Sequence, residues 1–322
     1  MAHKIAIYNN KGGVGKTTIG ANLASALAVT EKPDGTPYRV LLIDMDPQGN
    51  STEFLWLSRE WRAEEDKDRD FGLLITEDKP ISSVIYNYKA REFVRPNVEG
   101  DDVYEVTFLK DVTEDGQEIN TVQRFRLKEY PNFGVVPAYT RIGMGKNPKT
   151  GQWYDEDEIR AGLPVDFLSK KLAEIENNYD FILWDCPPSW DRFSKMAIFA
   201  SDQIIIPIRP GKFELDGIIG VGEKLEYFEE QYGKRPQLIF AIMNAVRGGV
   251  KGHQAYIRKN TLALEGLISS NGVPFTEEVT NSIDQYTPFV FARGKYPVMA
   301  DTFLDIAKEI IAKYNAKEKV NG

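Results

Sequence analysis

The sequence predicts an α/β fold, with a mostly parallel central sheet of about seven strands flanked by helices. Short runs rich in β-branched residues recur along the chain, and most of them are followed by a segment with helical periodicity. Strands joined by crossover helices produce this pattern. Several runs are apolar at every position, as expected of strands that are buried on both faces of a sheet. The predicted strands are 4–8, 39–43, 133–136, 180–184, 203–208, 237–243 and 275–279. The predicted helices are 17–29, 164–177, 191–200, 214–231, 253–269 and 300–316.

An insertion at about residues 59–131 interrupts this alternation, because the strand pattern resumes only at Phe133. It contains two segments of alternating residues, 103–109 and 121–130, which are separated by the turn-rich stretch DVTEDGQEIN. Two alternating segments joined by turn residues predict a β-hairpin. We therefore expect a hairpin insertion near 89–131.

Two further segments are assigned from shorter patterns. A short helix is predicted near 81–88, and the polar, glycine-containing stretch 141–163 predicts a surface loop. Because the sheet pattern resumes after the insertion, we expect a single domain over residues 1–322.

Composition and charge exclude several classes of protein. The hydrophobic fraction is 42%, yet no apolar run approaches the roughly 20 residues that a membrane-spanning helix needs. The N-terminus lacks the apolar segment of a secretory signal, which predicts a cytoplasmic protein. The single cysteine, Cys186, excludes an intramolecular disulfide and a cysteine-only metal site. The net charge of −8 means that any surface for nucleic acid has to be a local patch.

A glycine-rich segment, NNKGGVGKTT at residues 9–18, lies between the first predicted strand and the first predicted helix. Glycines permit backbone angles that turn successive N–H groups inward, and the start of the helix adds its positive dipole end. This is the context of the phosphate loop in a P-loop NTPase, where Lys16 reaches the β- and γ-phosphates of ATP and the Thr17 hydroxyl binds Mg²⁺. The predicted nucleotide-binding residues of the loop are Gly12, Gly13, Val14, Gly15, Lys16, Thr17 and Thr18.

The loop departs from the usual GxxxxGK[ST] spacing, because Asn10 stands where the first glycine is expected. It reads KGGxGKT instead, with an extra lysine, Lys11, five residues before Lys16. The loop resembles the deviant Walker A motif of the ParA/MinD superfamily, whose extra lysine reaches the partner's nucleotide in a sandwich dimer. The resemblance implies an ATP-dependent homodimer in which Lys11 takes part in catalysis in trans. The alternative is that Lys11 is a solvated surface charge.

Two carboxylates, Asp44 and Asp46, follow the predicted strand 39–43 in the stretch DMDPQGN. Ligands of open α/β sheets bind at this edge, where a carboxylate can orient the attacking water or hold Mg²⁺ through water. DMDPQGN resembles the ParA-type switch motif, which implies that Asp46 positions the water and that Asp44 supports the magnesium shell. The alternative is an aspartate-rich turn that caps a helix at 51–57.

Asp185 ends another apolar strand, DFILW, and is followed by CPPS. An apolar strand that ends in aspartate is the Walker B arrangement, in which the carboxylate holds the water shell of Mg²⁺. DCPPS also resembles the ParA motif, in the same chain order. Asn244 closes the strand 237–243, where the family has an adenine-contacting asparagine, although it could equally cap a turn. The implied metal-binding residues are Thr17, Asp46 and Asp185.

The segment from Lys234 to Leu264 contains basic residues but no acidic ones. Phosphate contacts carry most of the non-specific affinity for DNA, so a local basic surface can suffice on an acidic protein. The resemblance covers residues 4 to about 55 and about 164 to 313, and it implies that the ATP dimer binds DNA without sequence preference. An ordinary solvated charge cluster is the alternative. The candidate DNA contacts are Arg247, Lys251, Arg258 and Lys259.

The resemblance also implies a slow ATPase that positions or segregates a cargo, such as a plasmid, a chromosome or a protein complex, and is nucleoid-associated in the ATP state. We expect a ParB-like or cargo-adaptor protein to stimulate hydrolysis, because no arginine finger is identifiable around the phosphate loop. The loop begins almost at the first residue, so we expect no N-terminal helix-turn-helix domain.

Two other functions stay open. One is a MinD-like, membrane-associated positioning ATPase, because residues 301–316 carry an apolar stripe. We interpret this stripe as the packing face of a helix on the sheet, which makes a membrane partner the less favoured alternative. The other is an ATP-switched scaffold with negligible hydrolysis.

Overall fold

The structure is a computed structural model of the chain. It describes residues 1–57, 62, 66–67, 69–76, 78–95, 97–112, 118–139, 162–210, 214–247 and 267–321. The predicted helix 253–269 and the predicted surface loop 141–163 lie almost entirely outside the described residues.

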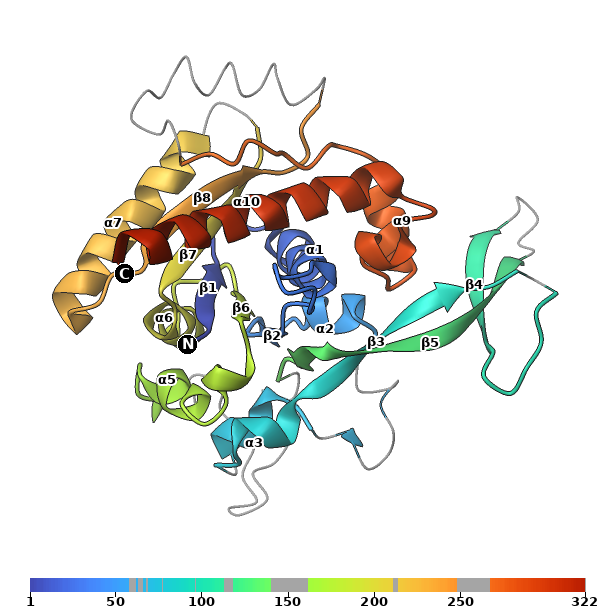
Figure 1. The fold of residues 1–322 in the computed structure, drawn as a ribbon, viewed down its shortest axis with the longest axis horizontal. Helices are drawn as coiled ribbons and strands as arrows, with labels where there is room; N and C mark the ends of the chain where they lie inside the picture. The colour runs from blue at the N-terminus through green and yellow to red at the C-terminus, as the bar shows by residue number, and fades with distance from the viewer. Residues whose placement is uncertain are drawn as a thin grey trace.

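The centre of the molecule is an eight-stranded, mostly parallel sheet, which confirms the predicted fold class (Figure 1). Its strand order is β3-β5-β2-β6-β1-β7-β8, and β4 pairs with β5 outside this path. The parallel strands, all predicted from the sequence, are β1 (His3–Ile7), β2 (Val40–Asp44), β6 (Phe181–Asp185), β7 (Gln203–Ile208), β8 (Gln237–Met243) and the last residues of β5 (Glu118–Val136).

The last predicted strand, 275–279, is wrong. Pro274 makes only an isolated bridge to Val246, and helix α9 (Glu278–Asp284) begins shortly after it. The backbone N–H of Glu278 donates to the Thr276 hydroxyl at 3.2 Å, which turns the chain into that helix. So short an alternation of apolar and polar residues does not separate a strand from a turn.

Helices lie on both faces of the sheet. Besides α9 they are α1 (Lys16–Val29), α2 (Asn50–Phe54), α3 (Phe71–Thr76), α5 (Phe167–Leu172), α6 (Arg192–Ala200), α7 (Glu214–Tyr232) and α10 (Pro297–Asn321), with 3₁₀ turns η3 (Ile81–Val84), η4 (Glu176–Asn178) and η6 (Phe289–Ala292). α1, α6, α7 and α10 confirm predicted helices. The segment predicted as helix 164–177 is shorter, because α5 ends at Leu172 and η4 follows as a 3₁₀ turn.

Alternate residues of the parallel strands face opposite layers, as the period-two geometry of a strand requires. On β1, Ile5 and Ile7 belong to a core that includes α1 and α10. Ala6 belongs to the other core, with α6 and α7. The sheet is therefore buried on both faces, which explains why its strands are apolar throughout.

The apolar stripe of α10 is part of the first core. This confirms the interpretation that the stripe is a packing face, and it removes the observation that favoured a membrane-facing helix. No helix in the described ranges combines the length and the apolar character that would let it cross a membrane. The fully buried residues of the stripe are Phe303, Ile306, Ala307 and Ile310.

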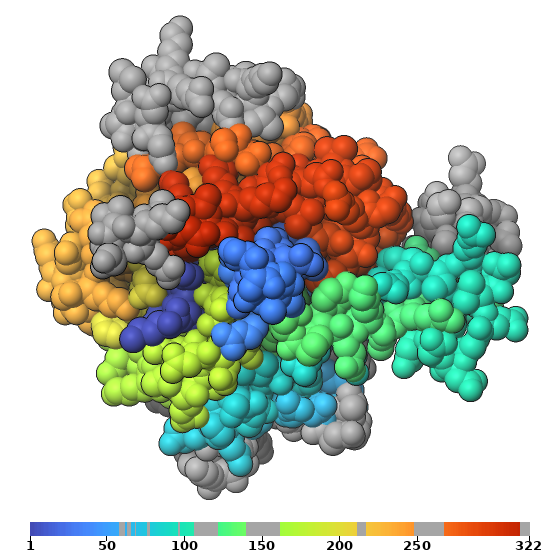
Figure 2. Space-filling view, viewed as in Figure 1, coloured from blue at the N-terminus to red at the C-terminus, as the bar shows by residue number. Residues whose placement is uncertain are grey.

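Three antiparallel strands extend the sheet into a projecting arm (Figures 1 and 2). The arm consists of β3 (Tyr86–Phe93), β4 (Tyr104–Val112) and residues 118–130 of β5. β4 and β5 confirm the predicted hairpin, whereas β3 replaces the second half of the predicted helix 81–88. β5 is 19 residues long and runs from the arm into the parallel core, where it pairs with β2. The insertion is therefore an extension of the central sheet.

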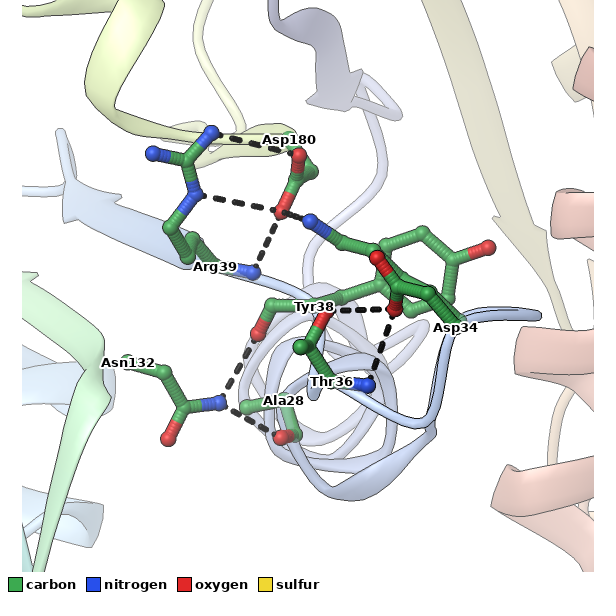
Figure 3. A network of polar contacts seen from close by, with 8 residues as sticks. Ala28, Asp34, Thr36, Tyr38, Arg39, Asn132 and Asp180 are labelled. Atoms are coloured by element: carbon green, nitrogen blue, oxygen red, sulfur yellow. Dashed lines mark hydrogen bonds and ion pairs between the residues drawn. The ribbon is translucent and has the colours of Figure 1, made fainter.

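Polar contacts fix the amino-terminal edge of the sheet (Figure 3). The Asn132 side-chain nitrogen donates to the carbonyl oxygens of Ala28 at 2.7 Å and Tyr38 at 2.8 Å. These bonds tie β5 to the end of α1 and to the segment that enters β2.

Asp180 holds the same edge at the start of β6. Its carboxylate accepts from the backbone N–H of Arg39 at 2.7 Å and pairs with the Lys32 ammonium at 2.7 Å. Burial tends to raise the pKa of Asp180, but the hydrogen bonds from Lys32 and Arg39 outweigh it, and the pKa is lowered. These contacts all lie at the amino-terminal edge of the sheet. The loops at the carboxyl ends of the strands lie at the opposite edge.

Candidate functional site

The loop between β1 and α1 is anchored by Asn9. The Asn9 side-chain nitrogen donates to the Pro207 carbonyl on β7 at 2.7 Å, and its side-chain oxygen accepts from the Lys11 backbone N–H at 3.0 Å. These bonds hold the start of the loop against the neighbouring strand. Sequence reasoning assigned no role to Asn9, although it belongs to the same NNKGGVGKTT segment.

Two glycines of the loop have left-handed backbone angles, Gly13 with a φ of 69° and Gly15 with a φ of 94°. A Cβ atom on Gly15 would lie 2.0 Å from the side-chain nitrogen of Asn244. That nitrogen donates to the Val14 carbonyl at 2.9 Å. Asn244 thus ties the end of β8 to the loop, and residue 15 has to be glycine because of both its φ and this close approach.

Lys16 is buried within the loop, with only 8% of the residue exposed. Its Nζ donates to the Lys11 carbonyl at 3.3 Å. Burial lowers the pKa of Lys16, while the carboxylates of Asp185 and Asp46 act in the opposite direction. The Lys11 side chain is exposed. The long hydrogen bond of Lys16 is of a kind that a phosphate oxygen can replace with a stronger, charge-assisted one.

Asp185 lies at the carboxyl end of β6, beside the loop. Its Oδ2 accepts from the Thr17 hydroxyl at 2.8 Å and from the Ser51 hydroxyl at 2.7 Å. Its Oδ1 is buried and meets no hydrogen-bond donor in the described part of the chain. Burial raises the pKa of Asp185 to about 6, although the hydrogen bonds from Ser51 and Thr17 act to lower it. A buried carboxylate oxygen without a donor, next to a threonine hydroxyl, suits a hydrated divalent cation.

Asp44 and Asp46 have different surroundings. The Oδ2 of Asp44 accepts from both the backbone N–H and the hydroxyl of Thr52 at 2.8 Å, and its Oδ1 accepts from the Asp46 N–H at 3.1 Å. Burial, with Asp185 nearby, raises the pKa of Asp44. Asp46 accepts from the Gln48 N–H at 3.0 Å. Asp44 therefore holds the backbone of Asp46 and the start of α2 in place.

The loop and the carboxyl ends of the strands surround a cavity of about 630 Å³. Most of the site residues predicted from the sequence meet there. Those that line the cavity are Gly12, Gly13, Gly15, Lys16, Thr17, Thr18, Asp46 and Asn244. Those that do not are Lys11, Val14, Asp44 and Asp185.

The rest of the cavity wall comes from residues that sequence reasoning did not assign. Phe275, Val279 and Ile283 give it an apolar side, against which a flat ring can pack. They are far from the loop in the sequence, and no local motif marks them. The unassigned lining residues are Gln48, Asn50, Glu53, Phe54, Pro188, Arg209, Ala245, Pro274, Phe275, Thr276, Val279, Thr280 and Ile283.

Arg247 is the predicted DNA contact that the structure describes. It is exposed, and its guanidinium carbon lies 4.1 Å from the centre of the Phe275 ring. The other three predicted contacts, Lys251, Arg258 and Lys259, lie outside the described residues, so their grouping into one surface stays a prediction.

Cys186, the only cysteine of the chain, is buried directly after Asp185. Burial raises the pKa of its thiol well above the usual range. Among the described residues, no group of three or more His, Cys, Asp or Glu side chains could hold a metal ion. A magnesium ion at this site would therefore take most of its ligands from water and from bound phosphate.

Comparison with known protein families agrees with this geometry. The family AAA_31, described as an AAA domain, matches residues 2–239. The chain belongs to this family. The AAA_31 chain is 31% identical to the sporulation initiation inhibitor protein Soj of Bacillus subtilis over 218 residues, which are 68% of the chain and 62% of Soj. It is 23% identical over 317 residues to the virulence plasmid ParA family protein pGP5-D of Chlamydia psittaci, covering 98% of the chain and 97% of that protein. The chain spans about 60% of the length of the first curated relatives that it matches.

Solved structures show the same fold as this AAA_31 chain. Apo McdA from Cyanothece has a TM-score of 0.65 at 17% identity and covers 96% of the chain, with 100% of McdA covered. A putative plasmid partition protein from Borrelia burgdorferi, bound to AMPPNP, has a TM-score of 0.62 at 20% identity, with 97% and 100% covered. Together with the Soj and ParA relatives, these findings confirm the resemblance to the ParA/MinD superfamily of P-loop proteins.

Replacing Asp185 with asparagine should stabilise the nucleotide-free protein at neutral pH. The pKa of Asp185 is raised to about 6 in the folded chain, whereas an aspartate of an unfolded chain has a pKa of about 3.9. Its contribution to stability is therefore complete below pH 4 and is lost as the pH rises through 6. Asparagine keeps an oxygen for Thr17 and Ser51 without a charge, so we expect a gain of roughly 1–3 kcal/mol at pH 8.

This gain is measured by urea unfolding at pH 4 and pH 8 in the presence of a chelator. It should disappear at pH 4, where the wild-type carboxyl is protonated as well. Asp101→Asn, at an exposed turn between β3 and β4, is the matched control and should show no such pH dependence. Equal gains at both pH values would show that burial does not disfavour the charged form of Asp185.

Proposed function

We propose that this chain is a ParA-type ATPase that binds ATP and Mg²⁺, dimerises around the nucleotide and positions or segregates a cargo. One observation carries the proposal: the phosphate loop, Asp46 and Asn244 line the same cavity at the carboxyl edge of the sheet. Structures of the same fold support it, because the Borrelia burgdorferi protein was solved with AMPPNP and a variant of Cyanothece McdA as an ATP complex.

The residues beside the loop fit a magnesium ion. Thr17 and Asp185 would hold it, because the Asp185 Oδ1 lacks a donor among the described residues and the Thr17 hydroxyl already faces that carboxylate. Asp46, on the cavity wall, would add a contact through water. When bound, the ion neutralises charge on the β- and γ-phosphates.

The cavity also has the parts for in-line attack on the γ-phosphate. Lys16 would exchange its bond to the Lys11 carbonyl for a phosphate oxygen. The Asp46 carboxylate would orient the attacking water, with Asp44 fixing the Asp46 backbone. Val14 and the glycines would present the loop N–H groups to the phosphates. We infer that turnover is slow until a ParB-like or cargo-adaptor partner supplies a basic group.

We expect ATP, but not ADP, to join two copies of the chain, with Lys11 of each reaching the phosphates bound to the other. Lys11→Ala should stay folded and monomeric with ATP, because the lost side chain is exposed in the free subunit. Light scattering with ATP, with ADP and without nucleotide measures this. Lys170→Ala on α5 is the matched control, since it also removes an exposed lysine. Dimerisation of Lys11→Ala at the wild-type ATP concentration would rule out a role of Lys11 in trans.

We also propose that the ATP dimer binds DNA without sequence preference through Arg247, Lys251, Arg258 and Lys259. Each lost phosphate contact should flatten the slope of log affinity against log salt by about 0.9. The test compares the wild type with Arg258→Ala plus Lys259→Ala on unrelated duplexes over a salt series, with Lys170→Ala as the control. An unchanged affinity and slope, with ATP dimerisation intact, would mean that these two residues do not contact DNA.

Two alternatives remain distinguishable from this proposal. The apolar stripe of α10 lies in the core, so a MinD-like membrane role has no support from that helix. An ATP-switched scaffold would form the same dimer but release no phosphate, even with its partner present. The proposed DNA binding would make the protein cytoplasmic and nucleoid-associated in its ATP state.

A further inference from the structure

Arg91, on β3 of the arm, is a buried arginine with two unpaired donor atoms in the described part of the chain. Only 2% of it is exposed, and its Nε and Nη1 atoms have no hydrogen-bond acceptor among the described residues. Burial lowers its pKa to about 10, which leaves the guanidinium charged at neutral pH. Burying a charged group whose donors are not all paired is costly, so another source of stabilisation is needed.

Three aromatic rings supply that stabilisation. The guanidinium carbon of Arg91 lies 3.7 Å from the ring centre of Trp56, 4.8 Å from that of Phe125 and 5.2 Å from that of Tyr286. Guanidinium groups at such distances are attracted to the ring faces, more strongly when water is excluded. Phe125 belongs to the arm, whereas Trp56 follows α2 and Tyr286 follows α9, outside the arm. The contacts of Arg91 therefore join the arm to two other segments.

Trp56 caps the end of α2 in a conformation that usually requires glycine. Its φ is 57°, its N–H donates to the Glu53 carbonyl at 2.8 Å, and the Leu57 N–H donates to the Thr52 carbonyl at 2.8 Å. This pair of bonds is the Schellman motif, whose left-handed position is normally occupied by glycine. A tryptophan there is strained, because its Cβ crowds the backbone.

Tyr286 repeats the arrangement at the end of α9. Its φ is 50°, its N–H donates to the Ile283 carbonyl at 2.8 Å, and the Thr287 N–H donates to the Ser282 carbonyl at 3.1 Å. A second large aromatic residue thus stands at the glycine position of a second Schellman motif. Backbone strain of this kind persists only where the surroundings hold it in place, and it gathers at functional sites. Here both strained rings face the same guanidinium.

The two capped helices form walls of the nucleotide cavity. α2 contributes Glu53 and Phe54, and α9 contributes Val279, Thr280 and Ile283. α2 also carries Ser51 and Thr52, which donate to the carboxylates at the ends of β6 and β2.

We propose that Arg91 is a positioning residue. By stacking on the caps of α2 and α9, it sets the distance between two walls of the nucleotide cavity. Nucleotide affinity then depends on the arm, which carries Arg91. This inference rests on the proposed function, because it assumes that the cavity binds nucleotide.

Arg91→Met is the main test, with a fluorescent ADP analogue and Mg²⁺ as the probe. Methionine fills similar space without unpaired buried donors, so the urea midpoint of the free protein should change little. The dissociation constant of the analogue should rise about tenfold, because the cation–π contacts that hold the two caps are lost. A purely structural arginine would show the opposite result, a lower urea midpoint with unchanged affinity.

Two variants test the route through the caps. Trp56→Gly and Tyr286→Gly place at each cap the residue that the motif prefers, so both should fold while losing the ring. Each should weaken binding of the analogue, and Arg91→Met should add little to the Trp56→Gly, Tyr286→Gly double variant. If Arg91→Met does not fold, these variants still test whether the contacts at the two caps affect nucleotide affinity. Lys89→Met is the control, because it removes an exposed lysine of the same strand.

The outcomes separate the two proposals. If the wild type does not bind the analogue, both the proposed function and the role of Arg91 fail. If the wild type binds and Arg91→Met binds equally well with a normal urea midpoint, only the role of Arg91 is overturned. The role of Arg91 is also overturned if the losses of affinity in Arg91→Met and in the glycine variants are additive. Substitutions that remove the same contact are not expected to be additive.

Discussion

Asp46→Ala is expected to lower the rate of ATP hydrolysis by about 10²- to 10³-fold while leaving the affinity for ATP within about threefold of the wild type. Asp46 is largely buried at 7% exposure, yet it lines the cavity, and its backbone is held by Asp44. In the proposed mechanism this carboxylate orients the attacking water, which would bind weakly in the ground state and be ordered in the transition state. Its loss therefore slows the chemical step more than it weakens nucleotide binding.

Phosphate release and equilibrium binding of a non-hydrolysable analogue measure the two quantities separately. Because ATP still binds, the variant should accumulate as an ATP-bound dimer in light scattering. Asp34→Ala, in the exposed loop before β2, is a control of matched size and charge. Hydrolysis by Asp46→Ala at the wild-type rate would move the catalytic role elsewhere, and Asp44 would be the next residue to replace.

Lys16→Ala is expected to weaken the binding of ATP by up to about 100-fold, since a hydrogen bond to a charged group contributes roughly 1.5–3 kcal/mol. In the free protein the Lys16 ammonium is buried and bonded to the Lys11 carbonyl at 3.3 Å. Burial lowers its pKa, which shows that the charged form is disfavoured there without a ligand. Removing the side chain should therefore leave the fold intact while it removes the phosphate contact that we propose for Lys16.

Isothermal titration with ATP and with ADP tests this prediction, and urea unfolding checks the fold. The loss should be larger for ATP than for ADP, because the side chain is expected to reach both the β- and the γ-phosphate. Lys11→Ala is the informative comparison, since the monomer should keep its nucleotide affinity when only the exposed lysine is removed. Wild-type affinity of Lys16→Ala for ATP would mean that the cavity is not a phosphate site.

The phosphate loop and the acidic motifs were predictable because each is contiguous in the sequence. Lys16 and Thr17 lie in a loop whose glycines, helix start and lysine are all local. Asp44 ends one apolar strand, with Asp46 two residues later, and Asp185 ends another. The parallel strands were also predictable, because strands buried on both faces are apolar at every position.

Strand β3 of the arm and the apolar cavity wall were harder to predict for physical reasons. Ile81, Val84, Ile85 and Tyr88 have the spacing of a helix face, but only Ile81–Val84 forms a 3₁₀ turn and Tyr88 lies in β3, paired to β5. The cavity wall from α9 forms only when the fold brings this helix close to the phosphate loop, which is far from it in the sequence. The burial of Arg91 had no local signal either, since it is set by rings from three separate segments.

The burial of Cys186 makes this chain convenient for site-specific labelling. It is the only thiol of the sequence, and burial raises its pKa, so maleimide reagents have neither access to it nor much thiolate to attack. A cysteine introduced at Tyr104, which is 49% exposed on the arm, would be the single reactive thiol of the folded protein. A dye or spin label there would report whether nucleotide changes the surroundings of the arm, without a cysteine-free background having to be prepared.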